Sequence, residues 1–294
     1  MSGTLAGIAW RRIADAPFGI EVSVDPTGPF DQHQQAALCE LYARDGLILM
    51  RSAEPLSMAA QAEFCRIFGP VPQDLHDTYL VSNTEPDGIL ADLELLFHHD
   101  ITFVPAPFLA GCLHALDVTP GVSATRFASG FLAWERMPQR LRDHIAELKA
   151  VFVRPRVEDR RCRLDDAWTG DNCAIHALVQ RQRGTGRPFV FANAHHTALV
   201  CGLSQQDSDD LLTELGTYLY SDDAIYEHSW TNRDLILWDN LALQHARAKV
   251  TGGRRTLQRV SVSVFGYEQQ YPADSGWYAD LQDGKINAGD HAAA

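Results

Sequence analysis

The segment Leu95–Phe103, "LLFHHDITF", places two histidines and an aspartate among leucine, isoleucine and phenylalanine. Burying imidazole and carboxylate groups without partners is costly, so such a cluster needs other polar side chains or a metal ion. If the segment is an extended strand, alternate side chains share a face. His98 and Asp100 then point to one side, and His99 points to the other. One imidazole and one carboxylate on one face supply two of the three ligands of a facial two-histidine, one-carboxylate metal site.

The third ligand must come from elsewhere in the chain, and twelve histidines supply the candidates. Four lie in polar or helical contexts and are expected at the surface: His33, His76, His144 and His228. His114 alternates with apolar residues, as a core histidine would. The second adjacent pair, His195 and His196, has no carboxylate two residues away. His245 directly follows a predicted strand and is the strongest candidate.

The segment after this histidine, "GGRRTLQRVSV" (252–262), is rich in arginine. Arg255 and Arg259 are four residues apart, so in a strand they share a face. A buried arginine is rarely found without an anion to pair with. Surface ion pairs with some of the 38 acidic residues are the alternative. Beside a candidate metal site, an anionic cosubstrate is the better explanation.

The bulk composition bounds the class of protein. At 294 residues, with 46% hydrophobic and 21% charged residues, the chain can bury a sizeable core. We find no internal repeat, linker or composition break, so we expect a single domain over 1–294, with a core at about 30–267 and a polar tail at 268–294. The net charge of −13 argues against nucleic acid or an anionic membrane as partner, but not against a small anion.

The cysteines and the apolar runs indicate the compartment. Six cysteines are scattered without a C-x-x-C pair, as expected for free thiols. Arg11 and Arg12 follow the short apolar N-terminal stretch, whereas in a secretion signal they would precede it. No apolar run approaches the ~18–20 residues that a membrane span needs. We therefore expect a cytoplasmic protein.

Hydrophobic periodicity and capping residues predict a mainly β core wrapped by N-terminal and inserted helices. Helices are expected over residues 30–46, 57–69, 138–151 and 204–220. Strands are expected over residues 47–50, 108–118, 124–129, 187–193, 234–240 and 259–267.

Together these segments resemble the Fe(II)- and 2-oxoglutarate-dependent dioxygenases of the taurine dioxygenase type (the TauD/TfdA family) over about residues 30–267. "FHHDITF" looks like the family's H-x-D-x-[ST]-F segment, and "WDNLALQHAR" looks like its W-D-N-x-x-x-x-H segment. "TPGVSATRFAS" looks like its threonine-containing segment, and "GGRRTLQRVSV" looks like its R-x-x-x-R segment. The fold that the resemblance implies is a double-stranded β-helix, or jelly roll.

The resemblance also implies a role for each matching residue. Fe(II) would be held by His98, Asp100 and His245. Thr125 and Arg255 would bind the distal, C5 carboxylate of 2-oxoglutarate, and Arg259 would lie nearer the metal, facing substrate or the C1 carboxylate. With O2 as the second cosubstrate, the enzyme would oxidise an unactivated C–H bond and release succinate and CO2. A homodimer is a further expectation from the family.

The substrate is predicted less closely. The candidate contacts are Glu94, Phe97, His76, Asn83 and Arg259. Sulfonate-binding relatives carry an asparagine four residues before the first ligand, where this chain has Glu94, so taurine is not expected. Arg259 favours an anionic group and Glu94 an amine, which suggests a carboxylated or amino acid-like small molecule. Hydroxylation, desaturation and cleavage all begin with the same hydrogen abstraction and stay open.

Two readings from other classes compete with the enzyme. A non-catalytic jelly-roll metal-binding or sensor protein would keep the fold, although every expected cosubstrate residue is present. A metal-independent hydrolase is not supported, because the chain lacks a G-x-S-x-G motif.

Overall fold

The computed structural model describes residues 1–72, 78–90, 92–122, 124–154, 159–166, 173–250 and 252–266. In these residues the chain is mainly β, with five α-helices around the strands. His76 and the predicted tail at 268–294 lie outside the described residues.

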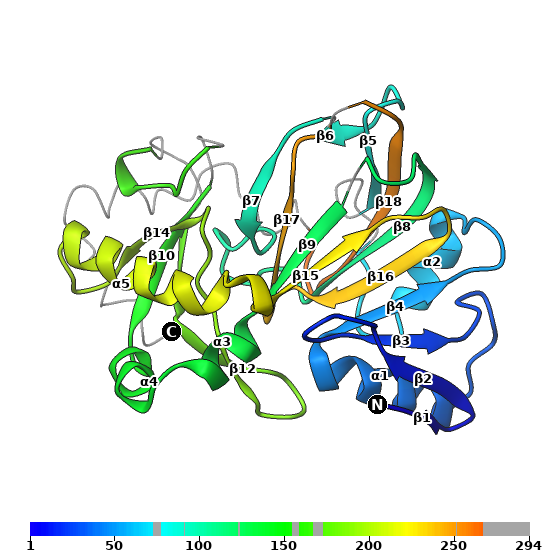
Figure 1. The fold of residues 1–294 in the computed structure, drawn as a ribbon, viewed down its shortest axis with the longest axis horizontal. Helices are drawn as coiled ribbons and strands as arrows, with labels where there is room; N and C mark the ends of the chain where they lie inside the picture. The colour runs from blue at the N-terminus through cyan, green and yellow to red at the C-terminus, as the bar shows by residue number, and fades with distance from the viewer. Residues whose placement is uncertain are drawn as a thin grey trace.

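The centre of the molecule is a pair of sheets. The larger sheet contains, in spatial order, β1 (Ser2–Leu5), β2 (Ile8–Arg12), β3 (Ile20–Ser23), β4 (Leu47–Arg51), β16 (Asp234–Asp239), β8 (Ala110–Val118), β18 (Arg255–Val262), β5 (Thr78–Ser82) and β6 (Ile89–Leu90). The smaller sheet contains β15 (Ile225–Ser229), β9 (Ala124–Ser129), β17 (Leu243–Arg247) and β7 (Leu95–His98). Its neighbouring strands are all antiparallel, and Figure 1 shows this sheet beside the larger one.

An apolar layer fills the space between the two sheets. Its buried members include Leu113, Phe127, Tyr226, Trp238, Leu243 and Leu257 from the two sheets, and Trp230, which directly follows β15. The Phe127 and Trp238 rings meet edge to face, with centroids 5.6 Å apart. A Cβ at Gly111 would collide with the Trp238 ring, so only glycine allows this strand to approach it. Residues of β9, β17 and β18 that share this inner face are therefore brought together.

Two helices cover the outer face of the larger sheet: α1 (Gln32–Asp45) and α2 (Met58–Cys65). A capping box between Asp31 and Gln34 starts α1, and Gly46 ends it with φ of 73°. These confirm the helix predicted over 30–46. The helix predicted over 57–69 is confirmed but ends earlier.

Residues between β9 and β15 form an inserted unit, on the left in Figure 1. It contains α3 (Gly130–Arg136), α4 (Gln139–Ile145), α5 (Gln205–Leu219), β10 (Lys149–Val153), β11 (Cys173–Ala177), β12 (Val179–Arg181), β13 (Pro188–Val190), β14 (Thr197–Val200) and the short 3-10 helices Leu164–Asp166 and Asp222–Ala224. The helix predicted over 138–151 is wrong in its second half. The chain turns into β10, because pairing with β11 on one side and β14 on the other outweighs local helical preference.

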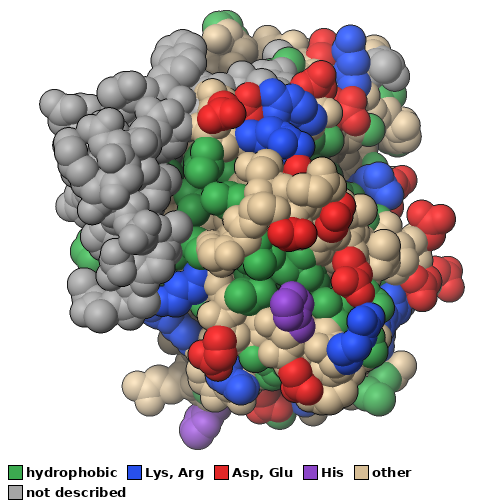
Figure 2. Space-filling model, turned by 90° about the vertical axis from the view of Figure 1, so that its left-hand side faces the viewer, with side chains coloured by type: hydrophobic (Ala, Val, Ile, Leu, Met, Phe, Trp, Pro, Cys, Tyr) green, Lys and Arg blue, Asp and Glu red, His purple; other side chains and the backbone are tan. Residues whose placement is uncertain are grey.

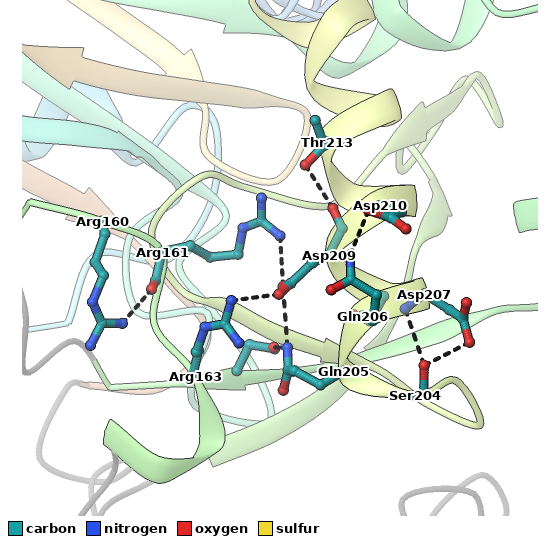
Figure 3. Close-up of polar contacts among 12 residues, drawn as sticks. Arg160, Arg161, Arg163, Ser204, Gln205, Gln206, Asp207, Asp209, Asp210 and Thr213 are labelled. Atoms are coloured by element: carbon teal, nitrogen blue, oxygen red, sulfur yellow. Dashed lines mark hydrogen bonds and ion pairs between the residues drawn. The ribbon is translucent and has the colours of Figure 1, made fainter.

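Partly exposed ion pairs join the long helix of the insert, α5, to the loop that follows β10. Asp209 on α5 accepts from Arg161 at 3.3 Å and from Arg163 at 2.5 Å, and Ser204 caps the helix start, as Figure 3 shows. On the face of the molecule at this end, acidic and basic side chains are interspersed among apolar ones (Figure 2). The described part of that face therefore carries charges of both signs.

The six cysteines all lie within the described residues and form no disulfide with one another, as predicted. None of the helices in the described ranges combines the length and the apolar character needed to cross a membrane.

Candidate metal centre

Two histidines and one aspartate meet where the smaller sheet ends. His98 on β7 and His245 on β17 are directly paired across the sheet, with ring centroids 4.3 Å apart. Nε2 of each imidazole lies 3.7 Å from Oδ1 of Asp100. One potential ligand atom from each of the three residues lies within 4.8 Å of the others. The structure thus brings together the three residues that the sequence singled out.

The turn that places Asp100 differs from the expected strand. β7 ends at His98, and the chain turns through Asp100 with Ile101 at φ of 48°. Asn240 fixes this turn: its Oδ1 accepts from the backbone N–H of Asp100 at 2.8 Å, and its Nδ2 donates to the Asp100 carbonyl at 3.2 Å. The convergence of His98 and Asp100 was predicted correctly. Its cause is the turn held by Asn240, and the predicted strand alternation does not produce it.

His99 points away from the other two, as expected. Its ring is fully buried, stacks on Phe191 at 4.7 Å and approaches the amide of Asn193 at 3.3 Å. Burial, with the neighbouring His98 as the next contribution, lowers the pKa of His99 to about 3. His99 is therefore a neutral packing residue.

Charge and hydrogen bonding prepare the three donors for a cation. Burial alone would raise the pKa of Asp100, but Arg259, His245 and His98 together hold it well below its usual value. Arg259 pairs with Oδ2 and leaves Oδ1 facing the imidazoles. Nδ1 of His98 lies 2.7 Å from the Leu96 carbonyl, which assigns the proton to Nδ1 and the lone pair to Nε2.

The donor set itself tests the fit to a metal ion. Burial first, and then the proximity of His98, lowers the pKa of His245 well below its usual value, so that imidazole is neutral. An imidazole nitrogen or a carboxylate binds a metal ion only when it is deprotonated. Two imidazoles and one carboxylate on one side of a site are the ligands typical of non-haem Fe(II) oxygenases. The residues present therefore fit Fe(II).

Two arginines of β18 face the space between the sheets. Arg255 and Arg259 are 2% and 3% exposed, and the core residue Leu257 lies between them on the strand. Arg254 instead lies at the surface and pairs with Asp117 at 2.7 Å. Burial, with the nearby Arg247 as the second cause, lowers the pKa of Arg255 to about 9. A buried cation in this environment would be stabilised by an anion.

Thr125 approaches the same space from β9. It is 2% exposed, and its Oγ1 accepts a hydrogen bond from Nε1 of Trp230 at 2.9 Å. The bond fixes the hydroxyl position while the Thr125 proton can still be donated.

The predicted substrate residues do not gather at one place. Phe97 stacks on Tyr220 with centroids 4.9 Å apart. The side chain of Glu94 is exposed. Asn83 accepts from the backbone of Arg255 at 2.9 Å and donates to Asp92 at 2.9 Å, so it fixes the start of β18. His76 cannot be placed, because it lies outside the described residues.

The second histidine pair, to which the sequence assigned no role, lies beside the metal centre. The ring centroids of His195 and His196 lie 6.4 Å and 5.6 Å, respectively, from the ring centroid of His98. His196 also meets the Thr102 hydroxyl at 2.9 Å. No carboxylate lies two residues from this pair, and its partners come from another segment of the chain, so the sequence pattern did not connect it to the metal centre. Their repetition of the "HH" pattern was the available signal.

Two other histidine predictions had opposite outcomes. His114 is a satisfied core residue, as expected: its Nε2 accepts from the backbone N–H of Leu56 at 3.0 Å. His228 was expected at the surface but is buried, because Asp234 at 3.0 Å and the Tyr226 hydroxyl at 2.8 Å satisfy both ring nitrogens.

A cavity of about 270 Å³ lies between α5 and the segment before β14. Its lining includes Arg161, Asn193, Thr213 and Tyr220. Asn193 also accepts from the backbone of both His195 and His196, so one cavity wall continues into the histidine cluster.

Comparison with known proteins identifies the protein family. The family described as "Taurine catabolism dioxygenase TauD, TfdA family" matches residues 11–261. The chain belongs to this family. Its relatives include a pentalenolactone F synthase of Streptomyces avermitilis, 24% identical, with 90% of this chain and 97% of the relative covered. An alpha-ketoglutarate-dependent 2,4-dichlorophenoxyacetate dioxygenase of Cupriavidus pinatubonensis is 27% identical, with 73% and 83% covered.

Solved structures show the same fold. AAD-2 in complex with Mn(II) and N-oxalylglycine matches with a TM-score of 0.74 at 19% identity, covering 88% of this chain and 98% of that one. A taurine dioxygenase from Burkholderia xenovorans matches with a TM-score of 0.73 at 21% identity, covering 87% and 90%. The predicted mainly β jelly roll with flanking helices is confirmed, as is the prediction of an oxidoreductase of the 2-oxoglutarate-dependent dioxygenase class.

Proposed function

We propose that this TauD/TfdA-family enzyme uses Fe(II), 2-oxoglutarate and O2 to oxidise an unactivated C–H bond of a small, carboxylate-bearing organic substrate, releasing succinate and CO2. The observation that carries the proposal is the convergence of His98, Asp100 and His245 within 4.8 Å. Two buried arginines on β18, Arg255 and Arg259, add positive charge to the same region.

His98, Asp100 and His245 would hold the metal. Bound there with 2-oxoglutarate and O2, Fe(II) supplies the power to remove hydrogen from an unactivated C–H bond. The chain supplies position and charge. Asn240 fixes the backbone that carries Asp100, and Arg259 keeps that carboxylate ionised. The apolar side chains of Ile101, Phe103, Val104 and Phe108, all buried next to the ligand turn, exclude water.

Arg255 and Thr125 would bind the distal carboxylate of 2-oxoglutarate. A guanidinium fork and a hydroxyl are suited to the two oxygens of a carboxylate. Both residues lie on the inner faces of facing strands and are almost fully buried, so the cosubstrate would bind them away from competing water.

Arg259 supports the choice of a carboxylate-bearing substrate. Its Nε is buried and has no hydrogen-bond partner among the described residues, so a charged donor is available beside Asp100. Relatives named for 2,4-dichlorophenoxyacetate and for (S)-phenoxypropionate act on carboxylates. Tyr220 lines the 270 Å³ cavity and Phe97 stacks on its ring, so this aromatic pair would border the apolar part of the substrate. Glu94 and Asn83 stay lesser candidates for its polar groups, as does an amino acid-like substrate. The homodimer also stays a prediction.

The test is succinate release by the Fe(II)-loaded protein, with 2-oxoglutarate, across a panel of aryl and alkyl carboxylic acids and their methyl esters. We expect the acids to stimulate turnover and the esters to fail. Equal stimulation by acids and esters would contradict the carboxylate preference. If iron-loaded protein consumes no 2-oxoglutarate, with or without a candidate substrate, the enzyme proposal is wrong and the metal-binding sensor is favoured.

A further inference from the structure

A third buried arginine lies close to the metal centre, and neither the family motifs nor the proposed mechanism assign it a role. Arg247 is two residues beyond His245 on β17, so the two side chains share the inner face of the strand. It is 3% exposed. A guanidinium desolvated to this degree needs hydrogen bonds or an anion.

Only part of the Arg247 guanidinium is satisfied. Nε donates to the Leu93 carbonyl at 2.9 Å, and Nη2 donates to the Leu90 carbonyl at 3.0 Å. Nη1 is buried without a hydrogen-bond partner among the described residues. The nearby acid, Asp92, is an exposed residue that already accepts from Asn83. Arg247 therefore has one charged donor still to satisfy.

The neighbours of Arg247 are the residues proposed to bind the cosubstrate. The register of β17 against β9 pairs His245 with Phe127 and Ala246 with Arg126. Arg247, the next residue of β17, and Thr125, the residue of β9 before Arg126, therefore lie at the same end of these two paired strands. Arg247 is also close enough to Arg255 that its charge lowers the pKa of that arginine. Two cations and a hydroxyl thus share one buried region, where an anion would offset their repulsion.

We propose that Arg247 is a second cationic contact for the distal carboxylate of 2-oxoglutarate, acting together with Arg255 and Thr125. The inference rests on the proposed function and adds a specificity-determining residue to it. With two guanidinium groups at one end of the site, binding depends on the distal carboxylate more strongly than a single arginine would allow. A 2-oxo acid that ends in a methyl group offers this buried region no distal carboxylate to accept their hydrogen bonds.

The test is calorimetric binding to the metal-loaded protein without O2, using Mn(II) or Fe(II). The ligands are 2-oxoglutarate and 2-oxopentanoate, which has the same chain length and a methyl group in place of the distal carboxylate. Arg247→Gln removes the charge but keeps an amide that can donate to Leu90 and Leu93. We expect it to weaken 2-oxoglutarate binding by about tenfold or more and to leave 2-oxopentanoate binding within about twofold.

Two further variants separate the possible outcomes. Arg247→Lys keeps one charge and should recover part of the affinity for 2-oxoglutarate. Arg255→Gln should also lose 2-oxoglutarate selectively, and the two glutamine variants should be non-additive, since they share one ligand group.

Equal losses for both ligands in Arg247→Gln would mean that Arg247 only positions the chain at residues 90–93, and would overturn the inference. So would unchanged binding of both ligands, while a selective loss in Arg255→Gln would leave the proposed function intact. A metal-loaded wild-type protein that binds no 2-oxoglutarate would overturn the proposed function itself.

Discussion

The metal centre and the outer end of the insert use charge in opposite ways. At the centre, Arg259, Arg255 and Arg247 are each at most 3% exposed, and Arg259 pairs with the carboxylate of Asp100. On α5, the arginines that meet Asp209 have side chains that are 26% and 50% exposed. Buried charges interact strongly and penalise the loss of a partner, whereas water screens exposed ones. Substitutions at the metal centre should therefore cause large losses of stability or of metal binding, whereas substitutions on α5 should change stability only slightly.

The largest effect is expected at Asp100. Asp100→Ala removes a metal ligand and leaves the buried Arg259 cation without its counter-charge, so metal binding should be lost and the free energy of unfolding should fall by about 3–5 kcal/mol. Urea unfolding and metal titration check both parts. The matched control is the double variant Asp100→Ala with Arg259→Met, which should recover stability without recovering metal binding. A single variant as stable as wild type would contradict the account.

A smaller effect should follow from Asn240→Ala. This variant keeps all three ligands but frees the turn that carries Asp100, so metal affinity should weaken by about tenfold or more. Gln61→Ala is the control: Gln61 is an equally buried amide bonded to backbone carbonyls, but it lies on α2 outside the sheets. That control should lower the unfolding free energy and leave metal affinity unchanged. Equal metal affinities in the two variants would show that the turn needs no support from Asn240.

A buried charge outside the metal centre gives a pH-dependent prediction. Burial would raise the pKa of Asp234, but hydrogen bonds from His228 and Thr231 lower it overall. The stabilisation by the carboxylate is thus present above the unfolded pKa of about 3.9 and is lost as pH falls through the lower folded value. Asp234→Asn should cost about 2 kcal/mol near neutral pH. The difference from wild type should shrink below about pH 4, and a constant difference in acid would contradict the assignment.

The smallest effect is expected on α5. Asp209→Asn weakens two partly exposed ion pairs, so the unfolding free energy should change by at most about 1 kcal/mol, and less in high salt (Figure 3). Thermal unfolding at low and high ionic strength measures it. A loss as large as that of Asp100→Ala would remove the contrast between the two regions.

The same contrast explains what could be predicted from the sequence. His98 and Asp100 lie two residues apart, so a short pattern exposes them, and spacing after the WDN segment adds His245. The turn held by Asn240 was not predicted, because its hydrogen bonds join residues 140 positions apart. The strand at Lys149–Val153 was missed for a similar reason, since both of its neighbours come from later in the chain. Helices with local caps, such as those starting after Asp31 and Ser204, were predicted well.

The buried arginines show the same difference between local patterns, which the sequence displays, and contacts between distant segments, which it does not. The spacing of Arg255 and Arg259 predicted that they share a face, and Leu257 between them confirms it. The role of Arg247 depends on Leu90, Leu93 and the register with β9, none of which a sequence pattern displays.

Metal binding by two neighbouring alanine variants tests the central claim most directly. His98→Ala and His99→Ala each remove one buried imidazole from adjacent positions, so differences in general stability are partly matched. Calorimetric titration of each with Fe(II), without O2, should show binding lost in His98→Ala and retained at one ion per chain in His99→Ala. Comparable losses in both, or loss in His99→Ala alone, would contradict a centre built from His98, Asp100 and His245.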